Sequence, residues 1–146
     1  MEASMDQDKL PHRNLYTRIK ASPKGVGLFA IRDIPCGTPL FVGDIGGTVK
    51  VPVSIVESIA DPEVRQMYID FCPVVGNAFV APRDFNQITM SWYLNHSDTP
   101  NVTVIPELQF VTSRFVRAGE ELTADYKTYS DHAGKYVAAW YDMQSI

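Results

Sequence analysis

Short runs of apolar and β-branched residues alternate with glycine and proline along most of the chain, a pattern typical of β-strands separated by turns. It predicts strands at residues 15–19, 27–31, 39–42, 101–105 and 108–116. The last two runs flank Pro106 and Glu107, a two-residue link that favours an antiparallel hairpin although it lacks the glycine that tight hairpin turns prefer. The pattern therefore predicts a mostly β fold of the α+β class.

Helical periodicity is confined to the middle and the end of the chain. Residues 54–60 and 62–71 favour helices, and Pro62 directly after Asp61 is typical of a capped helix start. A short helix is also expected over residues 84–94 and another over 135–143. The chain is thus expected to be a β-rich body that a helical insertion interrupts at about residues 50–80.

Length and charge narrow the class of protein. The 146 residues, 45% of them apolar, are enough for one domain with its own core. A net charge of −4 argues against direct binding to nucleic acid or to a membrane surface and favours a basic partner. Because no apolar run is long enough to span a bilayer and the first ten residues do not resemble a secretory signal, we expect an intracellular protein, cytoplasmic or nuclear.

The cysteines and histidines do not form a pattern typical of metal sites. Cys36 and Cys72 lie far apart, so we expect free thiols rather than a disulfide framework or a zinc cluster. His12, His96 and His132 have no cysteine, histidine or carboxylate partners at ligand spacing. The sequence therefore predicts no metal centre.

Three segments concentrate residues that build sites. Residues 91–101 are rich in Asn, His, Ser, Asp and Thr, which form either a pocket or a tightly hydrogen-bonded loop. Gly25 and Gly27 flank one apolar residue, which permits close approach of a ligand to the backbone or an ordinary turn before a strand. Tyr126 ends the run at 119–126, where a tyrosine is either a packing residue or a functional hydroxyl.

In this order the three segments resemble the SET-domain protein lysine methyltransferases, in the small single-domain form that lacks flanking zinc clusters. The resemblance covers about residues 15–130. It implies a SET-domain β-clip of short strands with a knot-like crossing, in which the C-terminal segment passes beneath the loop at residues 95–97. Residues 1–14 would then be a flexible segment and residues 131–146 a C-terminal cover.

The resemblance also implies a cofactor, S-adenosyl-L-methionine, which becomes S-adenosyl-L-homocysteine on methyl transfer. It aligns Tyr126 with the catalytic tyrosine of the family. The residues that it assigns to cofactor binding are Lys24, Gly25, Val26, Gly27, Leu28, Tyr93, Asn95, His96, Tyr126 and Trp140.

The substrate channel departs from the family pattern. Ala124, Val104 and Asp44 stand where family members commonly carry aromatic residues. Small side chains at Ala124 and Val104 would leave a roomier amine pocket, so we expect that more than one methyl group can be added. A peptide assay that stops at the monomethyl product under exhaustive conditions would contradict this expectation.

The resemblance therefore predicts a protein-lysine N-methyltransferase that acts on a lysine-containing basic protein or peptide, a histone or another target. The reduced set of channel aromatics keeps an alternative open, a SET-like binding module or cofactor sensor with little or no transferase activity. Both a monomer and a homodimer are compatible with the sequence.

Overall fold

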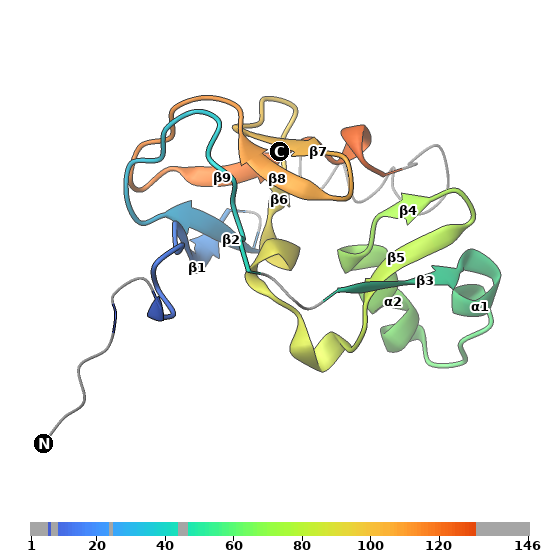
Figure 1. The fold of residues 1–146 in the computed structure, drawn as a ribbon. Coiled ribbons are helices and arrows are strands. Elements are labelled where there is room, and N and C mark those ends of the chain that lie inside the picture. Colours follow the sequence, from blue (N-terminus) through green and yellow to red (C-terminus); the bar gives the residue numbers. More distant parts are fainter. Residues whose placement is uncertain (1–5, 7–8, 24, 44–46, 131–146) are drawn as a thin grey trace, which may run out of the picture.

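The computed structural model describes residues 6, 9–23, 25–43 and 47–130, and two sheets organise them (Figure 1). The larger sheet has the strand order β1-β2-β9-β7-β8, and β6 pairs with β9 outside this path. Its strands are β1 (Thr17–Ser22), β2 (Gly25–Ala30), β6 (Asn95–His96), β7 (Val102–Ile105), β8 (Gln109–Thr112) and β9 (Glu121–Ala124). Strand outweighs helix, which confirms the predicted mostly β fold.

The insertion in the middle of the chain is mixed rather than purely helical. It contains α1 (Val53–Glu57) and α2 (Pro62–Phe71), and the side chain of Asp61 accepts a hydrogen bond from the Glu63 amide, as expected for a cap. It also contains a second sheet in the order β3-β5-β4, formed by β3 (Thr48–Pro52), β4 (Val74–Val75) and β5 (Ala78–Pro82). These strands, green in Figure 1, were not predicted, because β5 is a buried apolar run without alternation.

The prediction of a helix over residues 84–94 is wrong. Two 3-10 turns occupy this stretch, η2 (Phe85–Gln87) and η3 (Met90–Tyr93), and the chain between them is extended at Ile88 and Thr89. Asp84 caps the first turn by accepting a hydrogen bond from the Asn86 amide. The cap favours a helix start, but the backbone leaves the helical region at the β-branched residues Ile88 and Thr89, so the apolar spacing alone overestimated the helix length.

Two predicted strand features also change. Residues 39–42 form only an isolated bridge between Pro39 and Val111, because proline has no amide hydrogen with which to extend a ladder. The predicted hairpin of β7 and β8 is confirmed, but its link has three residues, since Ile105 pairs with Gln109. Glu107 and Leu108 adopt left-handed φ angles of 67° and 54° there, without a glycine.

Two apolar cores stabilise the two sheets. The core of the larger sheet holds fully buried Leu28, Val102 and Leu122. The core of the insertion surrounds Phe79, and Trp92 of η3 packs against it. Leu94, two residues later, belongs to the first core, so η3 lies between the two packed units.

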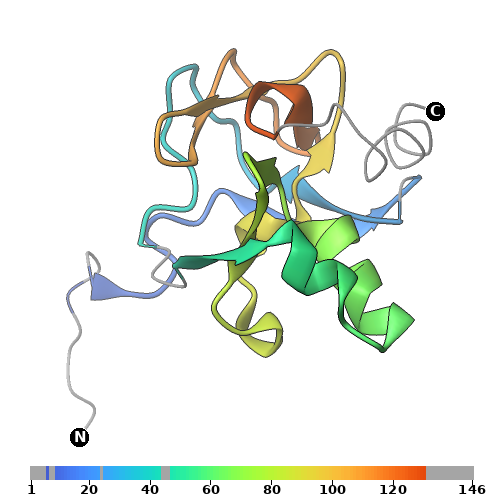
Figure 2. The same cartoon turned by 90° about the vertical axis from the view of Figure 1, so that its right-hand side faces the viewer.

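The pairing around β9 gathers the three candidate segments. Leu28 pairs with Leu122 in antiparallel register, and Asn95 and His96 pair with Thr123 and Ala124 in parallel register. In the turned view of Figure 2, the red turn η4 (Tyr126–Thr128) lies beside the orange and yellow strands. This is the neighbourhood that the knot-like crossing requires, and the threading itself stays a prediction.

Both cysteines are free thiols, as predicted. Cys36 is exposed, whereas burial of Cys72 raises the pKa of its thiol to about 12 and makes it unreactive at neutral pH. Within the described ranges, no helix has the length and apolar character that a membrane span needs. The segments predicted as a cover at 131–146, with its helix at 135–143, lie outside the described residues.

Candidate functional site

The glycine segment enters the site at the start of β2. Gly25 has a left-handed φ of 107°, which turns the chain from β1 into β2. Gly27 is buried, and a Cβ added to it would overlap the Glu121 carboxylate and lie 2.9 Å from Nδ2 of Asn95. Only glycine therefore lets these two polar side chains lie against the strand. Leu28 is fully buried beside it, while the Val26 side chain is exposed.

Asn95 joins the glycine segment to the last strand. Its side chain is buried, and Nδ2 donates hydrogen bonds to the Val26 carbonyl at 2.9 Å and to Oε2 of Glu121 at 2.8 Å. No described residue donates a hydrogen bond to its Oδ1. A buried amide oxygen without a donor is costly, so this atom is suited to a ligand that brings an N–H group.

Glu121 was not predicted as a site residue. Its carboxylate reaches the junction of Gly27 and Asn95 from β9. The pairing of Phe29 with Glu121 places it there, and no local signal in the sequence reveals that register. The junction thus offers an acceptor oxygen and a negative charge against the buried backbone of Gly27.

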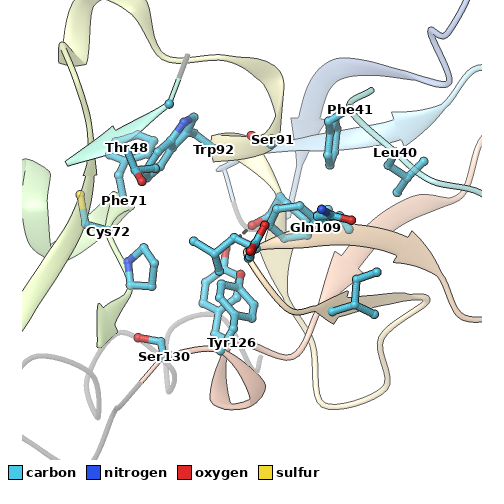
Figure 3. Close-up of a pocket in the computed structure, with 18 of the residues that line it drawn as sticks. Leu40, Phe41, Thr48, Phe71, Cys72, Ser91, Trp92, Gln109, Tyr126 and Ser130 are labelled. Atoms are coloured by element: carbon cyan, nitrogen blue, oxygen red, sulfur yellow. Dashed lines mark hydrogen bonds between the residues drawn. The ribbon is translucent and has the colours of Figure 1, made fainter. Parts of the chain in front are cut away.

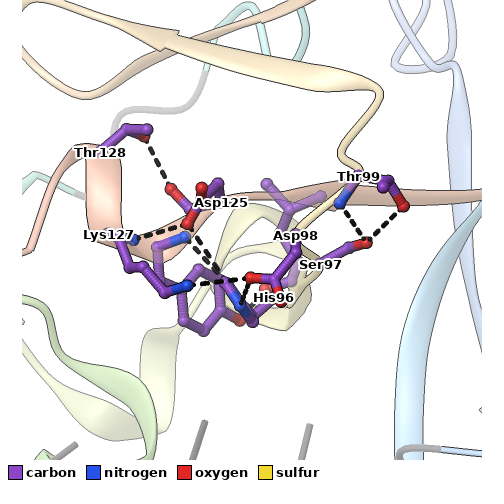
Figure 4. A network of polar contacts seen from close by, with 9 residues as sticks. His96, Ser97, Asp98, Thr99, Asp125, Lys127 and Thr128 are labelled. Carbon is purple, nitrogen blue, oxygen red and sulfur yellow. Dashed lines mark hydrogen bonds and ion pairs between the residues drawn. The ribbon is translucent and has the colours of Figure 1, made fainter. Parts of the chain in front are cut away.

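His96 is fully buried and connects the loop at residues 95–101 to η4. Its Nδ1 accepts a hydrogen bond from the backbone amide of Tyr126 at 3.1 Å, and its Nε2 lies 3.1 Å from Oδ1 of Asp98 (Figure 4). An imidazole nitrogen that accepts has no proton, so Nε2 carries it and donates to Asp98. The pKa of His96 is lowered, mainly because burial disfavours the charged ring, while the carboxylates of Asp98 and Asp125 act in the opposite direction.

Protonation of His96 should make the stability of the fold depend on pH. Above pH about 6.5 its contribution is fully present; as pH falls below that ordinary value, the unfolded chain takes up a proton that the folded protein excludes. The free energy of unfolding should then decrease by up to about 1.4 kcal/mol per pH unit, until the lowered folded-state pKa is reached. Urea unfolding between about pH 5 and 8 measures this slope.

The matched variants for this test are His96→Asn and His12→Gln. The first should have lower stability at all pH values and a weaker pH slope below 6.5. His12 is exposed, so its replacement should keep the wild-type slope. Identical slopes in the wild type and His96→Asn would contradict the assignment.

Tyr126 begins η4, and both its hydroxyl and its backbone amide are hydrogen-bonded. Its hydroxyl donates to the Leu94 carbonyl and its amide donates to His96. The ring lies 5.3 Å from the His96 ring and 5.7 Å from the ring of Tyr129. The hydroxyl is thereby fixed in direction by the segment that contains Leu94 and His96, which is distant from Tyr126 in the sequence.

Tyr126 also lines a cleft between the two sheets, with a volume of about 510 Å³. In Figure 3 the labelled side chains of Phe71, Trp92 and Thr48 lie on the side of the insertion, and Leu40 and Phe41 lie on the opposite side. A chain of edge-to-face aromatic contacts lines it, in the order Phe41, Phe110, Tyr129 and Tyr126. Asp70 and Glu107 are the charged residues among its described walls, and both are acidic.

The cleft supplies aromatic walls from positions that the sequence did not indicate. Phe41, Phe110 and Tyr129 are far apart in sequence, and only the pairing of β7 with β8 and the bridge at Pro39 bring them together. Of the predicted channel residues, Ala124 is fully buried in the core and Val104 packs against that core; neither lines this cleft. Their channel role stays a prediction.

The remaining predicted residues lie in different places. Tyr93 is half-buried in η3, with its ring 6.1 Å from the ring of Phe71. Lys24, Asp44 and Trp140 lie outside the described residues. The described site therefore unites Gly25–Leu28, Asn95, His96 and Tyr126 around β9.

The structure also brings together a group that the sequence analysis missed. His96, Asp98 and Asp125 place three ligand-type atoms within 4.8 Å of one another. The ammonium of Lys127 lies 3.0 Å from Oδ1 of Asp98, and Nδ1 of His96 is engaged by an amide. The Lys127 ammonium and the Tyr126 amide thus already bind ligand-type atoms of this cluster. The expected absence of a metal stays a prediction.

These features define a β-rich domain in which a glycine segment, a buried asparagine and a held tyrosine meet beside an aromatic cleft. A family model described as SET domain matches residues 25–127, which is most of the chain, and the protein belongs to this family. Its members are generally protein-lysine methyltransferases and typically use S-adenosylmethionine. A search among curated proteins finds no significant match.

Proposed function

We propose that the protein transfers methyl groups from S-adenosyl-L-methionine to a lysine side chain of a protein substrate. The observation that carries this proposal is the junction of Gly27 and Asn95, where a buried amide oxygen has no described donor. The neighbouring residue, Leu94, lines the aromatic cleft and accepts a hydrogen bond from the Tyr126 hydroxyl. Family membership supports the same chemistry.

The residues present fit the amino acid end of the cofactor. The Oδ1 atom of Asn95 would accept a hydrogen bond from its ammonium group, and the Glu121 carboxylate would balance the positive charge. The backbone of residues 25–28 and of His96 would line the rest of the site, while Lys24 and Trp140 complete the proposed set. When bound, the cofactor supplies an electrophilic methyl group on a sulfonium.

The acceptor amine must first lose its proton. Neutralising a lysine with an ordinary pKa near 10.4 at pH 7 costs roughly 4 to 5 kcal/mol. The apolar and aromatic walls of the cleft would lower the pKa of the lysine by desolvation, and a neighbouring sulfonium charge would lower it further. The lysine nitrogen would take up the methyl group with S-adenosyl-L-homocysteine as the leaving group, and alignment of the two reactants by the site would carry most of the catalysis.

Tyr126 is the proposed catalytic residue. Its hydroxyl proton is directed to the Leu94 carbonyl, so its oxygen would face the amine as a hydrogen-bond acceptor. An acceptor at that place orients the nitrogen lone pair toward the methyl group.

A basic protein segment is the proposed substrate. Asp70 at the end of α2 and Glu107 in the turn between β7 and β8 are exposed on two walls of the cleft. No described residue lining the cleft carries a positive charge, and the chain has a net charge of −4. These charges favour a lysine-rich partner and disfavour an acidic one. Both a monomer and a homodimer remain compatible with this proposal.

The direct test is calorimetric titration of the protein with S-adenosylmethionine and with S-adenosylhomocysteine. We expect micromolar binding by the wild type and a loss of at least about tenfold in Asn95→Ala, because that variant removes both the free Oδ1 and the contact with Val26. Asn86→Ala, in an exposed position, should bind as the wild type does. Absence of binding to the wild type, with and without lysine peptides, would overturn the proposal.

A further inference from the structure

Four residues around the start of η4 form a ring that is closed by hydrogen bonds and by the peptide bond between Tyr126 and Lys127. Asp98 contacts His96, His96 accepts from the amide of Tyr126, and the next residue, Lys127, returns to Asp98 through its ammonium at 3.0 Å. Figure 4 shows these side chains converging from the loop at 95–101 and from η4. Asp98 therefore contacts His96, which accepts from the Tyr126 amide, and Lys127, which follows Tyr126 in the chain. It does so although it lies distant from Tyr126 in sequence.

The direction of each bond matters for Tyr126. The Tyr126 amide needs an acceptor, which His96 provides only when its proton is on Nε2. Asp98 is an acceptor at Nε2, so it favours the required tautomer. The opposite tautomer would point an N–H of the ring at the N–H of Tyr126.

Lys127 gives Asp98 a second contact with η4, the turn that begins at Tyr126. The Asp98 carboxylate and the Lys127 ammonium are both exposed, so their ion pair is individually weak. Its value is geometric, because it links the loop that contains Asp98 to the residue after Tyr126. Asp125 adds a cap by accepting a hydrogen bond from the Lys127 amide at 3.0 Å.

We propose that Asp98 is a positioning residue for Tyr126, acting through the tautomer of His96. This inference rests on the proposed function in that Tyr126 is the catalytic residue to be positioned. Asp98 touches neither the cleft nor the glycine segment, so it sets the backbone from which the Tyr126 hydroxyl reaches the Leu94 carbonyl.

The experiment compares two replacements of Asp98 by NMR and by kinetics. Asp98→Leu removes the acceptor at nearly the same size, whereas Asp98→Asn retains an acceptor oxygen. Long-range proton–nitrogen spectra of labelled protein report which ring nitrogen of His96 carries the proton, and amide spectra report Tyr126. Methyl transfer to a lysine peptide gives kcat and KM.

In the wild type we expect the proton on Nε2. In Asp98→Leu we expect a mixture of tautomers, a shifted Tyr126 amide signal and a kcat reduced roughly ten- to hundredfold, with peptide KM within about twofold. Asp98→Asn should recover the wild-type tautomer and most of kcat. Asp84→Leu, which removes the matched cap of η2, should leave the His96 signals and kcat unchanged.

An unchanged His96 tautomer in Asp98→Leu would overturn the proposal, as would a changed tautomer with an unmoved Tyr126 amide. Equal impairment of Asp98→Asn and Asp98→Leu in both readouts would also overturn it. If the wild type methylates no lysine peptide, the proposed function fails, and the two NMR readouts still decide the role of Asp98.

Discussion

Replacement of Tyr126 by phenylalanine is expected to reduce kcat roughly 10²-fold or more, which corresponds to about 2.7 kcal/mol of transition-state stabilisation. Affinity for S-adenosylmethionine should stay within about twofold. The expected loss is large because the hydroxyl is held by the Leu94 carbonyl while the ring lines the cleft, so its direction is set before the substrate arrives. The ring contacts with His96 and Tyr129 are retained in the variant.

Single-turnover methyl transfer to a lysine peptide, together with calorimetry of the cofactor, separates the two effects. Tyr68→Phe is the matched control, because Tyr68 packs on Phe79 and Phe85 in the insertion and does not line the cleft. It should retain wild-type kcat. A Tyr126→Phe protein with undiminished turnover would remove Tyr126 from the mechanism, and a wild type that binds the cofactor without turnover would support the binding-module alternative.

Gly27→Ala is expected to weaken cofactor binding by roughly two orders of magnitude and to destabilise the fold by about 1 to 3 kcal/mol. The new Cβ would overlap the Glu121 carboxylate and crowd Nδ2 of Asn95. The ends of these two side chains must shift to make room, which disturbs the 2.8 Å hydrogen bond between them. The methyl group would thus disturb both groups that we assign to the cofactor ammonium.

Calorimetric titration and thermal unfolding measure the two consequences. Gly76→Ala is the control for destabilisation, because Gly76 has a positive φ of 63°, which alanine disfavours, whereas a Cβ there would meet open space. It should lower Tm while leaving cofactor affinity unchanged. In Gly27→Ala combined with Glu121→Ala, part of the stability should return, since the overlapping carboxylate is gone. Wild-type affinity in Gly27→Ala would place the cofactor elsewhere.

Local patterns predicted those elements whose signals lie within a few residues. The start of α2 was found because Asp61 and Pro62 form a cap and a first turn without help from the rest of the chain. The hairpin of β7 and β8 was found because its two strands are adjacent in sequence. Its three-residue link was missed, because two non-glycine residues there adopt left-handed angles that the tertiary fold stabilises.

The second sheet, β3-β5-β4, could not be predicted from local sequence patterns. β3 pairs with β5 across α1 and α2, so its stability depends on a contact between distant segments. The buried run of β5 has the same composition as a core helix segment, and only its partners identify it as a strand. The aromatic walls of the cleft were missed for the same reason.

The sequence by itself determined the family and the mostly β character, and it identified Asn95, His96 and Tyr126 as candidate site residues. All of these depend on residue types at short spacing. Only the tertiary structure decided that Glu121 lies against Gly27 and that Asp98 contacts both His96 and Lys127 beside Tyr126. Those contacts follow from the register of β9 with β2 and β6. A register is a choice among pairings of distant segments, and it is made by burial of Leu28, Leu122 and Ala124 in one core rather than by any local preference.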